Sequence, residues 1–306
     1  MYNIIQKRKI WLALSTCMVI ASIIFLILWG LNFGIDFTGG SLSEIKFLGQ
    51  RPAVDEIQAV IKDLDLGSLI IQPIGENNII LRFQDISEEK HQEIISRLNK
   101  LAGEKENNEV GEALYLEELR FDSVGPSIGQ ELKRKSLYAI VAVLIAIVLY
   151  IAWAFRKVSK PIASWKYGLA ATIALFHDVM IVLGVFALLG YFFDIEINSA
   201  FVAAILTVLG YSVNDTIVVF DRIRENLPKS DDDFEGTVNT SVNQTLTRSI
   251  NTSLTTLLVL LSILFFGGDT IRDFVLALSI GVFVGTYSSI FLASPVLVVW
   301  ERMRNR

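Results

Sequence analysis

Long apolar runs separated by short polar stretches dominate the chain. Six runs reach the length of about 20 residues that an α-helix needs to cross the hydrocarbon core of a bilayer. The pattern predicts membrane-spanning helices at residues 10–31, 136–155, 167–189, 198–220, 249–266 and 274–300. We therefore expect a multi-pass membrane protein built as an α-helical bundle of six transmembrane helices.

The region between the first and second spans has the pattern of a water-soluble domain. Alternating apolar and polar residues predict strands at 41–47, 69–74, 79–83 and 114–124, and helical apolar spacing marks 54–64 and 87–101. This order of strands and helices is the split βαβ, ferredoxin-like arrangement of a small α+β domain. The predicted organisation is residues 1–31 for the N-terminus and first span, 32–134 for this domain, and 135–306 for spans two to six.

Two connections between predicted elements contain recognisable sequence patterns. Gly125-Pro126 should end the last strand, and Ser127 and Gln130 have the spacing of a capping box for the helix that enters the membrane. Between spans four and five, apolar residues recur every four positions within residues 228–247, at Phe234, Val238, Val242 and Leu246. This spacing predicts an amphipathic connector helix along the cytoplasmic membrane face, and the favoured interpretation is that it closes the floor of the bundle.

Composition agrees with a membrane protein, and the charge distribution gives its orientation. The 306 residues are 52% hydrophobic and 19% charged, with a mean hydropathy of +0.51 and a net charge of −5. Lys and Arg cluster before span one, after spans two and four, and at the C-terminus, while Arg272 is the exception on the other side. By the positive-inside rule both termini are cytoplasmic and residues 32–134 lie outside, in the periplasm of a bacterium.

The sequence lacks the motifs that are typical of several classes of function. The one cysteine, Cys17, cannot form an intrachain disulfide. The sequence has no G-x-x-x-x-G-K-[S/T], H-E-x-x-H or C-x-x-C motif and no basic stripe, so we expect no cofactor, no metal and no nucleic-acid partner. The basic N-terminus precedes an apolar run that is too long for a signal peptide and lacks an A-x-A site, so we expect an uncleaved helix.

Two ionisable residues stand where membrane helices usually have none. Asp215 lies in span four after Asn214, and Arg248 opens span five. A charge within a bilayer costs about 2.5–3.5 kcal/mol on insertion scales, so such a residue is usually paired or functional. We interpret Asp215 and Arg248 as partners in a proton relay, because burial and a guanidinium act in opposite directions on a carboxyl group. The alternative is an interfacial ion pair that only fixes helix register.

Other polar residues could support this pair. Asn251 and Thr252 follow Arg248 on the predicted polar face of span five. His177 and Asp178 lie in the middle of span three and, being adjacent, should point about 100° apart, so both cannot face one partner. His177 either extends the proton path or has a hydrogen-bonded structural role, which is the favoured interpretation. The role of Asp178 stays open.

Five motifs resemble those of one family. GIDFTGG at 34–40 resembles the signature of the SecD/SecF family of accessory subunits in Sec-dependent export. VGPSIGQEL at 124–132, HD at 177–178, GYSVNDTIVVFDRIREN at 210–226 and RSINTSLTTLLV at 248–259 resemble the SecF branch in particular. Together they span nearly the whole chain.

The resemblance implies a fold, partners and a mechanism. The family belongs to the resistance–nodulation–division superfamily, so this chain would supply one six-helix half of a twelve-helix bundle in the bacterial inner membrane, with SecD supplying the other half. SecYEG, YajC and an unfolded preprotein are the further implied partners, besides the lipid bilayer. Proton flow would drive late steps of export, with Asp215 and Arg248 as the residues that match the family's proton-transport positions.

The hypothesis has a mechanical form and several rivals. Protonation of Asp215 would break its pairing with Arg248, shift the contact between two spans and tilt the external domain. A proton-driven exporter of small molecules or lipids from the same superfamily is the alternative, although it would normally need a larger external domain. A scaffold without a proton role is a third possibility. An intramembrane aspartyl protease using Asp178 and Asp215 does not fit the flanking residues, so we expect no enzyme activity.

Overall fold

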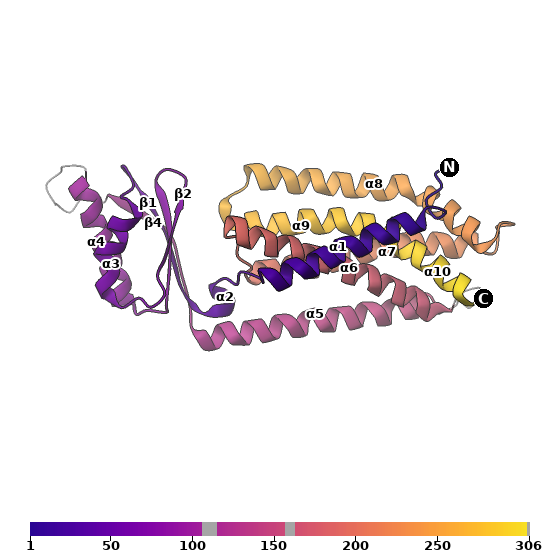
Figure 1. Ribbon diagram of the computed structural model, residues 1–306, viewed down its shortest axis with the longest axis horizontal. Helices are drawn as coiled ribbons and strands as arrows, with labels where there is room; N and C mark the ends of the chain where they lie inside the picture. The colour runs from indigo at the N-terminus through magenta and orange to yellow at the C-terminus, as the bar shows by residue number, and fades with distance from the viewer. Residues whose placement is uncertain (106–114, 157–162, 305–306) are drawn as a thin grey trace. The chain divides into compact units, whose positions relative to one another are not determined.

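The computed structural model describes residues 1–105, 115–156 and 163–304. The chain divides into two compact units, one formed by Met1–Asn32 with Ser136–Arg306 and the other by Phe33–Lys135 (Figure 1). The sequence-based limits at 32 and 134 differ from this division by one residue at each end. Each unit is described by itself below.

The first unit contains the membrane helices, except that the first residues of α5, up to Lys135, belong to the second unit. They are α1 (Arg8–Leu28), α5 (Pro126–Ala154), α6 (Ser164–Phe193), α7 (Ser199–Asn226), α8 (Phe234–Phe266) and α9 (Asp269–Ser288), which continues through the π-helix Ser289–Ala293 into α10 (Ser294–Arg304). Among the described residues, six helical stretches are long and apolar enough to cross a membrane, which confirms the predicted number of spans. The helices extend beyond the apolar runs because the runs report only the length buried in hydrocarbon.

Aromatic side chains fill the core where α6 begins and α7 ends. Tyr167 is fully buried and stacks on Phe155, with ring centroids 5.3 Å apart. Phe220 packs edge-on against both rings. Elsewhere small residues let the helices approach closely, as they commonly do in membrane bundles. An added Cβ at Gly281 of α9 would lie 2.2 Å from the side chain of Val208 on α7.

The connector between spans four and five differs from its prediction. Residues 234–247 are helical, and Val238 and Val242 are buried on one face. They form the start of α8 rather than a separate helix, because the chain from Thr237 to Phe266 contains no proline or glycine that would end it. The helix begins at a capping interaction in which the Asp233 carboxylate accepts a hydrogen bond of 2.8 Å from the Gly236 N–H.

The second unit is a four-stranded antiparallel sheet with two helices. Its elements are α2 (Ile35–Thr38), β1 (Gly40–Phe47), α3 (Val54–Ile61) followed by a 3₁₀ turn (Lys62–Leu64), β2 (Ile70–Ile74), β3 (Asn78–Phe83), α4 (Glu88–Lys105) and β4 (Leu116–Val124). The strand order is β2-β3-β1-β4, which is the ferredoxin-like topology. Figure 1 shows α3 and α4 together on one face of the sheet. The predicted fold class is therefore confirmed.

The double glycine of GIDFTGG has a steric explanation. Gly39 and Gly40 have φ values of +75° and +128°, which side chains rarely tolerate. A Cβ at Gly39 would lie 2.7 Å from the Cα of Pro126, and one at Gly40 would lie 2.7 Å from the carbonyl oxygen of Phe83. The one-turn helix α2, which the sequence pattern did not predict, lies directly before these two crowded glycines.

The predicted capping box at Ser127 and Gln130 is wrong. Helix α5 begins at Pro126, so Ser127 already lies in the first helical turn. The carbonyl of Gly125 accepts hydrogen bonds from the N–H groups of Ile128 and Gly129, at 3.0 and 3.1 Å. Proline suits the first helical position because its missing N–H would have no partner there and its φ is already helical.

Candidate functional site

Asp215 joins three helical segments. Its side chain is partly buried on α7. Oδ1 accepts a 2.6 Å hydrogen bond from the hydroxyl of Ser249 on α8, and Oδ2 accepts a second from the hydroxyl of Ser289 at the start of the π-helix. Hydrogen bonds from a hydroxyl to a carboxylate are among the stronger hydrogen bonds in proteins. The carboxyl group therefore fixes the contact of α7 with two other segments.

The predicted ion pair between Asp215 and Arg248 is absent. Arg248 is exposed, and it takes part in no ion pair within the described ranges. Successive residues of a helix point about 100° apart, so Ser249 rather than Arg248 faces Asp215. Asp215 therefore contacts α8 through Ser249 instead of through Arg248.

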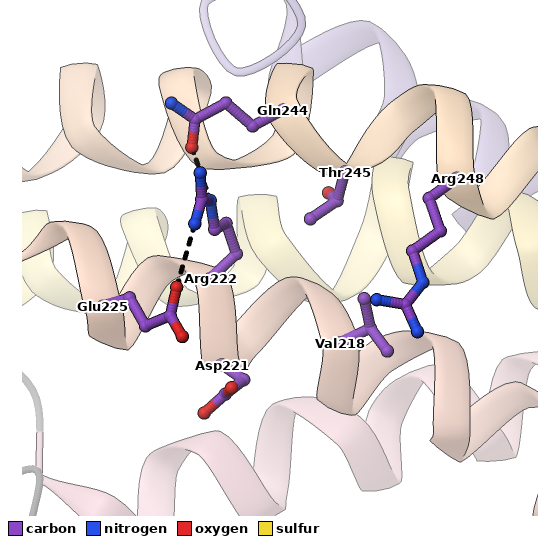
Figure 2. Close-up of a pocket in the computed structure, with 7 residues that line it drawn as sticks. All are labelled: Val218, Asp221, Arg222, Glu225, Gln244, Thr245 and Arg248. Atoms are coloured by element: carbon purple, nitrogen blue, oxygen red, sulfur yellow. Dashed lines mark hydrogen bonds and ion pairs between the residues drawn. The ribbon is translucent and has the colours of Figure 1, made fainter.

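Arg248 instead lines a cavity between α7 and α8. The cavity has a volume of about 270 Å³. Its lining also includes Val218, Asp221, Arg222, Glu225, Gln244 and Thr245. Figure 2 shows the guanidinium of Arg248 reaching from α8 toward α7 beside Val218, while Arg222 donates to Gln244 and Glu225. Val218 is three residues from Asp215, about 5 Å along the helix, so Arg248 lies about one helical turn from the carboxylate.

Three other predicted residues do not contact Asp215. Asn214, Asn251 and Thr252 are exposed, and none of their side chains makes a hydrogen bond within the described parts of the chain. One turn away from Asp215, the Tyr211 hydroxyl donates to Ser253 at 3.1 Å, and Thr286 donates to the same serine at 2.5 Å. The polar layer between α7, α8 and α9 therefore consists mainly of hydroxyl groups.

A second carboxylate lies deeper in the bundle. Asp178 on α6 is fully buried, and its Oδ2 accepts hydrogen bonds from Ser212 on α7 at 2.5 Å and from Ser288 on α9 at 2.8 Å. The adjacent His177 contacts Asp178 itself, with its Nδ1 atom 2.9 Å from Asp178 Oδ1. The Nε2 atom of this buried histidine has no hydrogen-bond partner among the residues that the structure describes.

The two carboxylates share neighbouring anchors. Ser288, which binds Asp178, and Ser289, which binds Asp215, are consecutive residues where α9 passes into the π-helix. Ser212, the other donor to Asp178, lies one turn before Asp215 on α7. Single π-helical turns inside α-helices often occur at functional sites. The sequence signal that could have located this arrangement is a pair of serines inside a long apolar run.

The site has no feature of a metal centre. Among residues 1–105, 115–156 and 163–304, no group of three or more His, Cys, Asp or Glu side chains is placed to hold an ion. The two aspartates bind serine hydroxyls rather than each other, unlike the paired carboxylates of aspartyl proteases.

Six membrane spans, hydroxyl-bound carboxylates between them and a small soluble domain after the first span define a membrane transport protein. Sequence comparison places it more closely. A sequence model of the family described as "Protein export membrane protein SecD/SecF, C-terminal" matches residues 104–303, and the "SecD/SecF GG Motif" matches residues 27–47. The chain belongs to the SecD/SecF family, in its SecF branch, and is a transporter subunit rather than an enzyme.

Full-length relatives share this assignment. "Protein translocase subunit SecF" of Thermobaculum terrenum is 42% identical over 313 residues, covering 98% of this chain and 94% of the relative. The protein of the same name from Desulfurispirillum indicum is 43% identical over 303 residues, covering 97% and 90%.

Solved structures agree. The crystal structure of SecDF, a translocon-associated membrane protein from Thermus thermophilus, superposes with a TM-score of 0.81 at 34% identity and covers 100% of this chain. SecDF in a super-membrane-facing form gives 0.68 at 33% identity and covers 99% of this chain. This chain spans 39% of the length of each of those two chains.

Proposed function

We propose that this subunit works with SecD as one half of a SecDF-type complex in which proton flow drives late steps of protein export. The substrate would be an unfolded preprotein leaving the SecYEG channel, with YajC as a further partner. Both termini would lie in the cytoplasm of a bacterium, and residues 32–134 would lie in the periplasm. The distribution of Lys and Arg supports this orientation.

The observation that carries the proposal is the position of Asp215. An ionised Asp215 accepts hydrogen bonds from α8 and from the π-helix at once. A protonated carboxyl group must itself donate, so at least one of these contacts has to rearrange. Each hydrogen bond to a charged group contributes about 1.5–3 kcal/mol, and one charge crossing 100 mV releases about 2.3 kcal/mol. A membrane potential is therefore large enough to change the contact between these helices.

Arg248 completes the proposed relay from the cavity. One turn from Asp215 and without a carboxylate partner in the described structure, its positive charge favours release of the proton toward that cavity. His177 is a supporting polar group through its contact with Asp178. Asn214, Asn251 and Thr252 form an exposed polar surface on α7 and α8, which we propose the SecD half covers, because unpaired amide groups are unfavourable in lipid.

Substitution of Asp215 tests the proton-coupled function. Asp215→Asn keeps the shape of the side chain and removes its ability to bind and release a proton. In vesicles containing the complete complex with SecD and SecYEG, it should abolish the gradient-dependent part of export while leaving the amount of assembled complex unchanged. Asp231→Asn, the same change in an exposed residue between α7 and α8, is the matched control. Gradient-dependent export that survives in Asp215→Asn would refute the proposal.

The orientation has a separate test. In a Cys17→Ser background, a cysteine introduced at Glu76, an exposed residue between β2 and β3, should react with a membrane-impermeant maleimide in intact spheroplasts. A cysteine at Lys229, exposed between α7 and α8, should react only after lysis. The opposite labelling pattern would reverse the assigned topology.

A further inference from the structure

We propose that Asp178 is a second proton-holding group, coupled to Asp215 through the consecutive serines Ser288 and Ser289. This inference rests on the proposed function, because it adds a residue to the same proton-coupled site. An aspartate near the protein surface is common and needs no functional role to account for it. Asp178 requires an explanation, because it is a fully buried ionisable group in the middle of a membrane helix.

The surroundings of Asp178 can hold either protonation state. Asp178 is fully buried, and its carboxyl group lies within hydrogen-bond distance of the hydroxyls of Ser212 and Ser288, which can donate or accept. Within the described residues no Lys or Arg pairs with it, and its one potentially cationic neighbour is His177. An ionised carboxylate without a counter-charge is costly to bury, so uptake of a proton by Asp178 would remove that cost.

The two consecutive serines have a second acceptor available. Ser288 Oγ lies 2.8 Å from Asp178 and 3.1 Å from the carbonyl oxygen of Gly285. Ser289 Oγ contacts Asp215 and lies 3.0 Å from the carbonyl oxygen of Thr286. A serine hydroxyl has one hydrogen, so it can donate to only one of these partners at a time.

This geometry lets each carboxyl group gain a proton when the hydrogen bond to its serine reverses direction. When Asp178 is ionised, Ser288 donates to it. When Asp178 takes up a proton from the aqueous phase that also supplies Asp215, its new O–H donates to Ser288, and the serine hydrogen turns to Gly285. In either state the Asp178 carboxyl group and the Ser288 hydroxyl keep a hydrogen-bond partner, so neither group carries the penalty of an unmade hydrogen bond. The same exchange applies to Asp215, Ser289 and Thr286.

Coupling between the carboxyl groups follows from shared backbone. Ser288 and Ser289 are adjacent, so a shift of the turn at either serine moves the other. On α7, Ser212 donates to Asp178 and lies one turn from Asp215, so this helix also connects the two carboxyl groups. The geometry therefore links the protonation of one aspartate to the hydrogen bonds of the other without direct contact between them.

Within the part of the chain that the structure describes, few other titratable groups lie near Asp178. His177 lies on its own helix, and Tyr287 lies on α9 with its ring 6.0 Å from that of His177, while Asp215 on α7 is linked to Asp178 through the neighbouring serines. The hydroxyl of Tyr287 lies 3.1 Å from Ser15 Oγ on α1. Helix α1 contributes this serine and no charged side chain to the contact. A protonation change at Asp178 would therefore affect contacts made by α1 as well as contacts made by α7 and α9.

The test uses the complex with SecD reconstituted in vesicles. Infrared difference spectra between acidic and alkaline pH should contain two carboxylic-acid bands from buried groups, one lost in Asp178→Asn and the other in Asp215→Asn. Proton flux, followed with an entrapped pH dye, should fall about tenfold or more in Asp178→Asn, as general acid–base groups typically contribute at least that factor. Assembly with SecD and the unfolding temperature should stay unchanged.

Serine variants separate proton holding from packing. Ser288→Ala should shift the Asp178 band and, more weakly, the Asp215 band. Ser279→Ala is the matched control, because this buried serine on the same helix donates only to the carbonyl of Val275. If Asp178→Asn fails to assemble, the response of both bands to Ser288→Ala decides the question, and two bands unchanged in that variant overturn the inference.

The outcomes also distinguish this inference from the proposed function. Wild-type flux and an unaltered spectrum in Asp178→Asn, with flux lost in Asp215→Asn, would overturn the role of Asp178 alone. Unchanged gradient-dependent export in Asp215→Asn would overturn the proposed function, while the infrared bands would still report whether Asp178 binds a proton.

Discussion

Helix α1 packs on the bundle through small side chains, and this makes Gly184 a sensitive position. Ser15 and Ser22, two turns apart, are the buried residues of α1. Gly184 on α6 lies against Ser22, and a Cβ built there would be 2.4 Å from the Ser22 Cβ and 2.5 Å from its Cα. Carbon atoms need about 3.5–4.0 Å, and the backbone of Ser22 cannot rotate away as a side chain can. Gly184→Ala should therefore force the two helices apart by roughly 1 Å.

The magnitude follows from two opposing terms. Overpacking of this kind costs about 1–3 kcal/mol. Replacing glycine by alanine inside a helix stabilises it by about 1 kcal/mol. Gly210→Ala on α7 isolates the second term, because nothing lies within 4 Å of a Cβ at that position. The difference in unfolding free energy between the two variants should therefore be about 1–3 kcal/mol, which is the overpacking term alone.

Reversible unfolding of the detergent-solubilised chain measures this difference. Ser22→Gly should partly rescue Gly184→Ala, because it removes the serine side chain that crowds the new methyl group but leaves the backbone of residue 22 in place. Equal stability of the Gly184→Ala and Gly210→Ala variants would mean that α1 does not pack on α6 through this serine. The reasoning from steric crowding would then be refuted.

Two further predictions concern other parts of the chain. A hydrogen bond from Arg97 lowers the pKa of Asp63 below its ordinary value, so its stabilising effect is present above the unfolded-state pKa and is lost as the pH falls through the folded-state pKa. Asp63→Asn should therefore reduce amide-exchange protection in α3 and α4 at neutral pH but not below that pKa. Asn239→Ala leaves the backbone N–H groups of Ile4 and Ile5 without their acceptor, which should lower the unfolding free energy by about 1–3 kcal/mol. Proteolysis near Ile4 should therefore become faster, whereas the exposed control Asn251→Ala should leave its rate unchanged.

Much of the fold could be predicted because its signals are local. An apolar run of membrane length is its own evidence for a span, and strict alternation in residues such as Ile45 and Phe47 identifies the buried face of a strand. Local sequence patterns predicted the ends of helices less well. Helix α5 starts at Pro126 instead of using Ser127 as a cap, and α8 continues through the connector, because no residue there interrupts a helix.

The candidate site was only partly accessible to sequence reasoning. Asp215 is conspicuous because a carboxylate is rare inside an apolar run. The serines that bind it are not, since small hydroxyl residues are frequent at contacts between membrane helices. Asp178 was noticed but could not be given a role, because its partners Ser212 and Ser288 come from two other helices. Sequence spacing describes one helix at a time, and the site exists only between helices.

The choice between Arg248 and Ser249 as the neighbour of Asp215 has a physical basis. Both residues begin the apolar part of α8, and a rotation of about 100° would exchange them. Burying a guanidinium between helices is costly, whereas a hydroxyl that donates to a carboxylate is readily accommodated. The structure accordingly buries Ser249 and leaves Arg248 exposed at the cavity. Asp215 is therefore held by hydroxyl donors from α8 and from the π-helix instead of by an ion pair with Arg248.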